Sequence, residues 1–145
     1  MRILVDGDAC PDKMEIYLLA EKYHVEMIVY MDYAHICYGE DYQVKYCEVG
    51  KDSVDMMIVH DVLANDIVIT QDYGLSSLLL TKSVKVLHVN GEIIDRSNIQ
   101  ELLMQRYIGV KNRKRNKHIK GPKKRTSQQS HYLLQQLELL LRESI

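Results

Sequence analysis

Aspartates end two apolar segments of this chain and could together form an acidic pocket. Asp6 and Asp8 follow an apolar run over residues 3–5, and Asp72 closes a second run over residues 67–69. In a parallel sheet, such segments deliver their last residues to the edge where ligands bind. Clustered carboxylates repel one another unless a cation or a proton is shared between them. The pattern therefore predicts a divalent metal site.

A further pair of aspartates lies between these two segments. Asp52 and Asp55 are three residues apart, so a helix beginning near residue 52 presents both on one face. Asp52 also suits the cap of that helix, and the helix dipole favours an acid in the first turn. Oxygen-rich sites suit Mg²⁺ or Mn²⁺, and two such ions can promote attack of water on a phosphodiester. Each of these aspartates could instead serve only as a cap or a strand-end ion pair.

The C-terminal third is strongly basic, although the net charge of the chain is only −1. No carboxylate occurs between Glu101 and Glu138, and this stretch carries ten basic residues, of which Arg106 is the first. Such a segment supplies charge for nucleic-acid phosphates, although solvated lysine-rich loops are also common. We expect nucleic-acid contacts from Lys111, Arg113, Lys114, Arg115, Lys117, Lys120, Lys123, Lys124 and Arg125.

The other reactive side chains give weaker indications. All ten aromatic residues are tyrosine, and five of them lie between residues 30 and 46, near His35. Exposed tyrosines can stack on unpaired bases, but loop packing or a subunit contact is the simpler explanation. The remaining five histidines lack ligand spacing, and the three cysteines contain no Cys-x-x-Cys pair, which favours reduced thiols.

Strands that alternate with helices must position these side chains. Apolar stretches predict strands over residues 2–6, 25–30, 43–49, 66–71 and 84–89, the third at a sheet edge. Helical signals lie over residues 11–23, 52–65, 74–82, 97–107 and 126–145, and residues 31–43 are expected to form a loop. The alternation predicts an α/β fold, a three-layer sandwich whose central, mostly parallel sheet of about five strands is flanked by helices.

One domain is expected over residues 1–145, with a basic loop or arm at 111–125. That segment has almost no apolar side chains and ends at Gly121-Pro122, so it cannot form core. The final helix, residues 126–145, could use its leucines for the core or for a homodimer. These leucines are Leu133, Leu134, Leu137, Leu140 and Leu141.

The overall composition argues against a membrane-spanning or a secreted protein. With 145 residues, of which 46% are hydrophobic, the chain resembles an ordinary globular domain. No apolar run approaches the ~20 residues of a membrane span, and the early aspartates interrupt any signal-peptide core. We therefore expect a cytoplasmic protein with no membrane partner.

Three motifs that occur in order along the chain resemble the YaiI/YqxD family. They are Val5-Asp6-Gly7-Asp8-Ala9-Cys10-Pro11, Gly50-Lys51-Asp52-Ser53-Val54-Asp55 and Asp66-Ile67-Val68-Ile69-Thr70-Gln71-Asp72, and Gly121-Pro122 precedes the terminal helix. That family is similar to the PIN-like superfamily, whose members are typically metal-dependent nucleases with a parallel sheet flanked by helices. The resemblance implies a PIN-like fold with Asp6, Asp55 and Asp72 in the catalytic pocket. Metal ligation is implied for these three and for Asp8 and Asp52 close by.

Three positions depart from the family pattern. Gly7 stands where the family usually has a small residue other than glycine, and Gly74 stands near a usual proline. Asn90-Gly91 replaces an Arg-Gly pair, so any role of that arginine is absent from this chain.

The favoured function is that of a metal-dependent phosphodiesterase that acts on RNA or single-stranded nucleic acid with Mg²⁺ or Mn²⁺. The alternative is a non-catalytic nucleic-acid-binding or adaptor protein of the same fold. A haloacid-dehalogenase-like phosphatase ranks third, because Asp6-Gly7-Asp8 matches its Asp-x-Asp start. Cys10 is unusual for that class, and no later Asp-Asp motif follows a strand.

Overall fold

A computed structural model describes residues 1–36, 41–50, 52–115 and 126–144 of the protein. In chain order the elements of these residues are β1 (Arg2–Asp6), α1 (Lys13–Lys22), β2 (Glu26–Asp32), η1 (Tyr33–His35), β3 (Gln43–Cys47), α2 (Ser53–Asp61), β4 (Ile67–Thr70), α3 (Tyr73–Leu80), β5 (Lys85–His88), β6 (Ile93–Ile94), α4 (Ile99–Arg115) and α5 (Ser127–Ser144).

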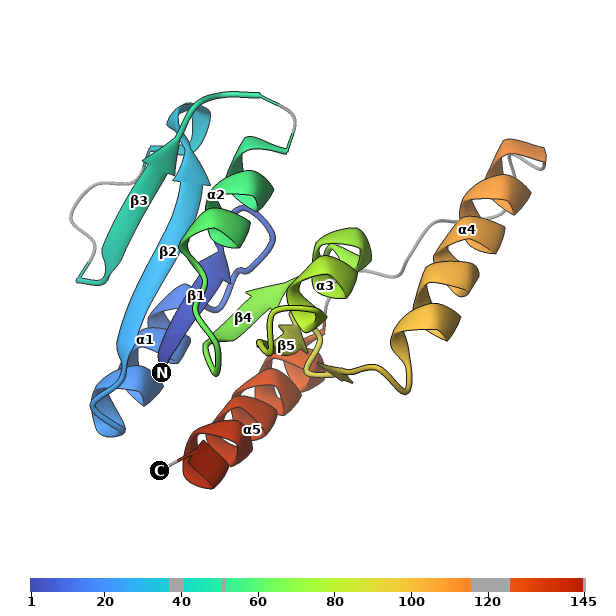
Figure 1. The fold of residues 1–145 in the computed structure, drawn as a ribbon. Coiled ribbons are helices and arrows are strands. Elements are labelled where there is room, and N and C mark those ends of the chain that lie inside the picture. Colours follow the sequence, from blue (N-terminus) through green and yellow to red (C-terminus); the bar gives the residue numbers. More distant parts are fainter. Residues whose placement is uncertain (37–40, 51, 116–125, 145) are drawn as a thin grey trace.

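Within the described residues, six strands form one sheet in the order β3-β2-β1-β4-β5-β6 (Figure 1). The first five strands are parallel to one another, and β6 pairs antiparallel with β5. Val5 of β1 lies between Val29 of β2 and Ile69 of β4. The sheet grows outward from β1 on one side and from β4 on the other. Open α/β sheets bind ligands at such a reversal, outside the carboxyl ends of the strands, and we call this edge of β1 and β4 the crevice.

Helices cover both faces of the sheet, which produces three layers. Ile3 and Val5 pack in the core under α1 and α5, and Leu4 packs in the core under α2 and α3. All three side chains are fully buried, and their alternation follows from the two-residue period of a strand. The predicted α/β sandwich with a mostly parallel sheet is therefore confirmed (Figure 1).

Several predicted elements have different ends in the structure. β2 continues to Asp32, so this residue belongs to the sheet and not to the predicted loop. α2 ends at Asp61, before the predicted end at residue 65. After the turn at Gly91, which has a φ of 100°, the described residues add the two-residue strand β6 to the five predicted strands. A strand this short has too little hydrophobic alternation to be recognised in a sequence.

Helix α4 differs most from the prediction. It runs from Ile99 to Arg115, well past the predicted end at residue 107. Lys111, Arg113, Lys114 and Arg115 therefore lie on a helix and not on a loop or arm, which corrects the prediction for these residues. Lys and Arg are good helix formers, and cations near a helix C-terminus are favoured by its dipole. The remaining predicted residues of the arm, Lys117, Lys120, Lys123, Lys124 and Arg125, lie outside the described residues.

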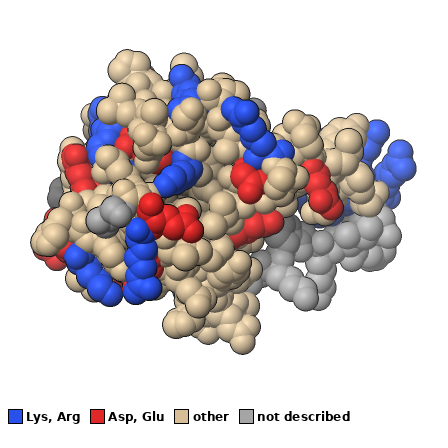
Figure 2. Space-filling view, turned by 60° about the horizontal axis from the view of Figure 1, so that its bottom comes forward, with Lys and Arg blue, Asp and Glu red and all other residues tan. Residues whose placement is uncertain are grey.

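The greater part of α4 stands away from the rest of the protein (Figure 1). Its first turn packs against α3, and among its described side chains Ile99 alone is buried. Met104, Tyr107 and Ile108 are 57%, 58% and 49% exposed. Lys and Arg side chains gather at the right-hand tip of Figure 2, where α4 ends. α4 thus presents both apolar and basic side chains to solvent.

The final helix α5 uses its leucines in the core. Leu133, Leu137, Leu140 and Leu141 are buried on the face shared with α1, and Leu134 is partly buried there. The predicted inward stripe is confirmed, and because the core covers it, this stripe is not free to form a dimer seam. Neither α5 nor any other helix in the described ranges is long and apolar enough to cross a membrane.

A polar network fixes the C-terminal end of α2 to the sheet. Tyr30 of β2 is fully buried, and its hydroxyl donates to Asp61 Oδ2 at 2.8 Å. Lys45 Nζ donates to the same oxygen at 2.6 Å, and His60 Nδ1 lies 3.0 Å from Asp61 Oδ1. Burial alone would raise the pKa of Asp61, but hydrogen bonds from Lys45, His60 and Tyr30 lower it to about 2. The network anchors the helix that carries Asp55 at its other end.

Candidate functional site

Asp6 is buried at the crevice between β1 and β4. Its residue surface is 9% exposed, and Thr70, the last residue of β4, donates its hydroxyl hydrogen to Asp6 Oδ2 at 3.0 Å. Burial raises the pKa of Asp6 and the charges of Asp8 and Asp72 raise it further, whereas the Thr70 hydrogen bond lowers it. Among the described residues, Thr70 is the only hydrogen-bond donor to this carboxylate.

Asp66 shows how the same sheet satisfies a buried carboxylate elsewhere. It precedes β4 at the opposite edge and is 1% exposed. It accepts hydrogen bonds from Arg2 N at 2.9 Å, Arg2 Nη2 at 2.7 Å and Leu63 N at 2.9 Å. A carboxylate can accept about four hydrogen bonds, and leaving a buried one short of partners is unfavourable. In contrast to Asp66, the Asp6 carboxylate can therefore accept a further hydrogen bond or bind a cation.

Asp72 caps a helix and also lies at the crevice. Its Oδ1 accepts a hydrogen bond from Leu75 N at 3.0 Å, which makes it the N-cap of α3. Its own N–H donates to Thr70 Oγ1 at 3.1 Å, so one hydroxyl group connects Asp72 with Asp6. The cap therefore does not exclude Asp72 from the acidic group, and its charge acts on both Asp6 and Asp55.

Asp55, in the first turn of α2, completes this acidic group. Burial raises the pKa of Asp55 to about 7, together with a hydrogen bond to Asp72 and the charges of Asp72, Asp6 and Asp52. A hydrogen bond between two carboxyl groups requires that one of them holds a proton. The end of β1, the start of α2 and the start of α3 thus place Asp6, Asp55 and Asp72 within electrostatic range of one another. Ligand atoms of these three do not all lie within 4.8 Å of one another, whereas those of Asp8, Asp32 and His35 do. The raised pKa keeps Asp55 protonated up to about neutral pH.

Asp52 lies at the rim of this acidic group. It occupies the N-cap position of α2, as predicted, but its side chain makes no capping hydrogen bond. Its backbone is left-handed, with a φ of 66°, a conformation that aspartate tolerates better than most residues. The side chain is exposed, and its charge raises the pKa of Asp55. Its role as a metal ligand stays a prediction.

Asp8 lies beside His35 and Asp32 at the end of β2. The Gly7 N–H donates to Tyr30 O at 2.8 Å, so the chain follows β2 for one residue beyond β1. Asp8 then leaves the sheet, and its Oδ1 lies 3.5 Å from His35 Nδ1. Asp8 still influences Asp6 through its charge. The two acids of the Asp-Gly-Asp motif therefore have different surroundings, which does not favour the phosphatase alternative.

A second polar group consists of Asp8, Asp32 and His35. One donor atom from each lies within 4.8 Å of the others, and His35 Nδ1 is 2.8 Å from Asp32 Oδ1. The hydrogen bond that His35 donates to Asp32 raises the pKa of His35, and the charge of Asp8 raises it further. Asp32 was expected in a loop, although an apolar run over residues 27–31 precedes it. That run ends in an aspartate as the other two do, and this is the signal that could have identified it.

The tyrosine cluster is explained by packing for the residues that the structure describes. The rings of Tyr33 and Tyr46 stack with centroids 5.8 Å apart. Those of Tyr17 and Tyr42 are tilted, with centroids 6.0 Å apart. Tyr38 lies outside the described residues. A base-stacking surface is not needed to account for these residues.

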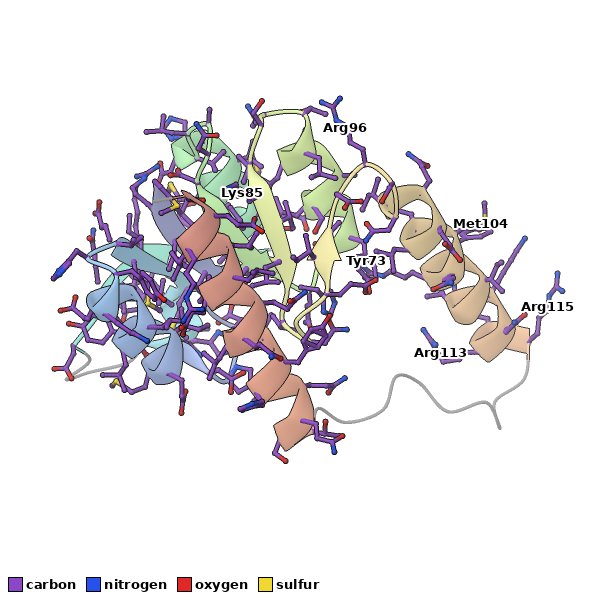
Figure 3. The ribbon with its side chains drawn as sticks, turned by 90° about the horizontal axis from the view of Figure 1, so that it is seen from below. Tyr73, Lys85, Arg96, Met104, Arg113 and Arg115 are labelled. Atoms are coloured by element: carbon purple, nitrogen blue, oxygen red, sulfur yellow. The ribbon has the colours of Figure 1, made fainter. Side chains whose placement is uncertain are left out.

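Helix α4 brings one basic side chain, Arg106, near the start of α3. Burial raises the pKa of Tyr73, the charge of Glu92 raises it further, and the charge of Arg106 lowers it, so Arg106 lies within electrostatic range of Tyr73. Tyr73 follows Asp72 directly and begins α3. Figure 3 shows Tyr73 between the sheet and α4, with Arg115 at the far end of that helix. Arg106 is one of the ten basic residues of the C-terminal stretch, but the sequence predicts no nucleic-acid contact for it.

An apolar groove of about 370 Å³ runs from Asp55 between α2 and α3. Met56 and Leu78 form its exposed walls, with exposed fractions of 70% and 47%, and Gly74 lies at its side. A larger groove of about 750 Å³ lies between α1 and α5, on the opposite face of the sheet. The smaller groove is therefore the one that shares a residue with the acidic group.

The fold and the crevice define an α/β protein with clustered aspartates at the point where the strand order reverses. The chain belongs to the YaiI/YqxD family: the family described as "Uncharacterized BCR, YaiI/YqxD family" matches residues 4–143. The resemblance identified from the sequence motifs is thereby confirmed.

Several relatives match this chain over nearly their full lengths. A UPF0178 protein of Natranaerobius thermophilus is 40% identical, with 99% of this chain and 100% of the relative covered. A UPF0178 protein of Clostridium tetani is 41% identical, with 97% of each chain covered. A UPF0178 protein of Clostridium kluyveri is 39% identical, with 97% of this chain and 93% of the relative covered. No solved structure matches the chain significantly.

Proposed function

We propose that this protein is a metal-dependent phosphodiesterase that cleaves RNA or single-stranded nucleic acid at the acidic crevice. The observation that carries the proposal concerns Asp6. Its buried carboxylate accepts one hydrogen bond from the described residues, that of Thr70, and it lies near Asp55 and Asp72. Such a group is unfavourable as three free anions, and a divalent cation removes the repulsion.

The donor set fits Mg²⁺ or Mn²⁺. Both ions prefer oxygen ligands, and carboxylates are their usual protein ligands. Asp6, Asp55 and Asp72 would hold the cation, with Asp52 and Asp8 contributing negative charge from nearby. When bound, such a cation supplies Lewis-acid charge to a phosphodiester and lowers the pKa of an attacking water.

The protein's own residues prepare this crevice. Thr70 holds Asp6 in place, and the cap at the start of α3 fixes one oxygen of Asp72. Asp55 is held by the first turn of α2 and must lose its proton before it can bind a cation. Binding should therefore strengthen as the pH rises through about 7, where Asp55 ionises.

Nucleic acid is the proposed substrate because positive charge lies beside the crevice. Arg106 is in electrostatic range of Tyr73, and Lys111, Arg113 and Lys114 follow along α4. These cations would bind the phosphate backbone. The resemblance to PIN-like nucleases supports the same reaction class, although fold-level likeness is a weaker argument than the site itself.

Cleavage of end-labelled single-stranded RNA with Mn²⁺ tests the proposal. Wild type, Asp6→Asn combined with Asp72→Asn, and the surface control Asp41→Asn are purified in parallel. We expect cleavage by wild type and the control and none by the double variant, because both replaced carboxylates belong to the acidic group. Equal cleavage by all three preparations, or by none, would refute the proposed nuclease activity.

Calorimetric titration with Mn²⁺ and filter binding of RNA separate the alternatives. A nuclease binds Mn²⁺ in wild type and loses this binding in the double variant. A non-catalytic nucleic-acid-binding protein instead binds RNA in a salt-sensitive manner without turnover, and the aspartate substitutions leave that binding unchanged.

A further inference from the structure

An apolar stripe runs along the outer side of α4. Met104, Tyr107, Ile108 and Lys111 follow one another at the spacing that places side chains on one face of a helix. The first three are about half exposed, and Lys111 Nζ lies 5.3 Å from the centre of the Tyr107 ring. The stripe is therefore continuous, and none of the described residues of the chain buries it.

The stripe faces away from the protein body. Ile99, Leu102 and Leu103 belong to the core beneath α2 and α3 and occupy the inner side of α4. Figure 3 shows Met104 on the side of α4 opposite to Tyr73. Contiguous exposed apolar side chains of this kind mark protein contacts more often than solvent-facing surface.

We propose that this stripe is a homodimer interface in which α4 of one chain pairs antiparallel with α4 of a second copy. Such a two-fold arrangement is self-complementary and closes after two subunits. With the axis near Tyr107 and Ile108, each Met104 lies opposite Lys111 of the partner subunit. The apolar side chains of both copies are then covered together.

The charges at the two ends of α4 favour this direction. Glu101 lies in the first turn of α4 and Arg115 in its last turn, and both are exposed. At 3.6 residues per turn they lie on the same flank of the stripe. Antiparallel pairing brings Arg115 of one chain to Glu101 of the partner subunit at both ends. Parallel pairing would instead place the basic ends together, where like charges repel.

A second copy fits the stripe better than nucleic acid does. Phosphates bind cations, whereas the centre of the stripe is made of Met104 and Ile108 and its first turn holds Glu101. Arg106 and Arg113 lie off the stripe and remain available for other contacts. The dimer therefore does not depend on the proposed nuclease function.

Sedimentation equilibrium of the full chain tests the dimer. Because the interface is small, association is expected at micromolar rather than nanomolar concentrations. Ile108→Glu should weaken association about tenfold or more, since it places two carboxylates near the axis. The matched control Leu139→Glu changes an equally exposed leucine on α5, 45% against 49% exposed, and should have no effect.

A charge exchange and a cross-link identify the pairing. Arg115→Glu should weaken association, and the double variant Arg115→Glu with Glu101→Arg should restore it. Ile108→Cys should form a disulfide-linked dimer on oxidation, compared with the parent chain that has no added cysteine. Circular dichroism checks that each variant keeps its helices.

Three results would overturn the proposal. Wild type could stay monomeric up to millimolar concentration. Leu139→Glu could abolish association while Ile108→Glu leaves it intact, which would place the interface in the groove between α1 and α5. Association could also require added RNA, which would make nucleic acid the occupant of α4.

Discussion

Replacing Asp55 with asparagine should stabilise the cation-free protein above neutral pH. The pKa of Asp55 rises from an ordinary 3.8 to about 7 in the folded protein, because of its burial and the neighbouring carboxylates. Between these values the folded chain holds a proton that the unfolded chain releases. The contribution of Asp55 to stability is therefore fully present below about pH 4 and is lost as the pH rises through 7. Asparagine cannot ionise and so avoids this loss.

The size of the effect follows from the same values. At 1.36 kcal/mol for each pH unit between the two pKa values, full ionisation of Asp55 costs at most about 4 kcal/mol. Solvent screens a half-buried group, so we expect about 1–2 kcal/mol at pH 8.5. For a chain of this size that corresponds to a rise of roughly 3–6 °C in Tm.

Thermal unfolding with EDTA at pH 4 and pH 8.5 measures this difference. Asp55→Asn should unfold at the higher temperature at pH 8.5, and the two chains should converge at pH 4. Saturating Mn²⁺ should reverse the order, because a ligand that binds only the folded state stabilises it in proportion to its affinity. The exposed Asp41→Asn substitution controls for a general effect of removing negative charge.

Two results would refute this reasoning. Asp55→Asn could destabilise the protein equally at both pH values, which would mean that Asp55 makes favourable contacts as an anion. Alternatively, Mn²⁺ could stabilise wild type and variant by the same amount, which would exclude Asp55 from cation binding.

Three further predictions concern the fold and are measured by urea denaturation. Leu137→Ala should cost about 2–5 kcal/mol, because the leucine is fully buried between α5 and the sheet; a cost below 1 kcal/mol would contradict its place in the core. Arg2→Met should cost about 2–3 kcal/mol, since it leaves the buried carboxylate of Asp66 without its 2.7 Å partner. Tyr30→Phe should cost about 1 kcal/mol at pH 7 by removing a hydrogen bond to Asp61. Because the pKa of Asp61 is about 2, this last cost should shrink as the pH falls from 4 to 2, and a pH-independent cost would argue against it.

The sequence was most informative where local pattern and burial agree. Apolar runs that end in Asp6 and Asp72 predicted two central strands and their shared edge, because few structures other than a buried parallel strand suit such a run. The position of Asp55 in the first turn of a helix was also recognisable. Its closeness to Asp72 depends on how α2 packs across the sheet, and this packing cannot be predicted from the spacing of the two residues along the chain.

The differences arose where contacts between distant residues decide the outcome. The direction of Asp8 is set by His35 and Asp32, which lie at the end of another strand. The predicted α4 was too short because its last residues lack apolar periodicity. Lys and Arg favour a helix by intrinsic propensity alone, so the helix continues to Arg115. The leucines of α5 were placed inward correctly, but only the structure shows that the core covers them.

The Thr70 hydroxyl ties two members of the acidic group to one strand end. Its single hydrogen is donated to Asp6, and its oxygen accepts the backbone hydrogen of Asp72. One side chain of β4 therefore holds the buried carboxylate of Asp6 and the backbone of Asp72 in a fixed relative position. Asp55, the third member, lines the groove between α2 and α3. Loss of the Thr70 hydroxyl would loosen two corners of the acidic group at once, although Thr70 is not itself an acid.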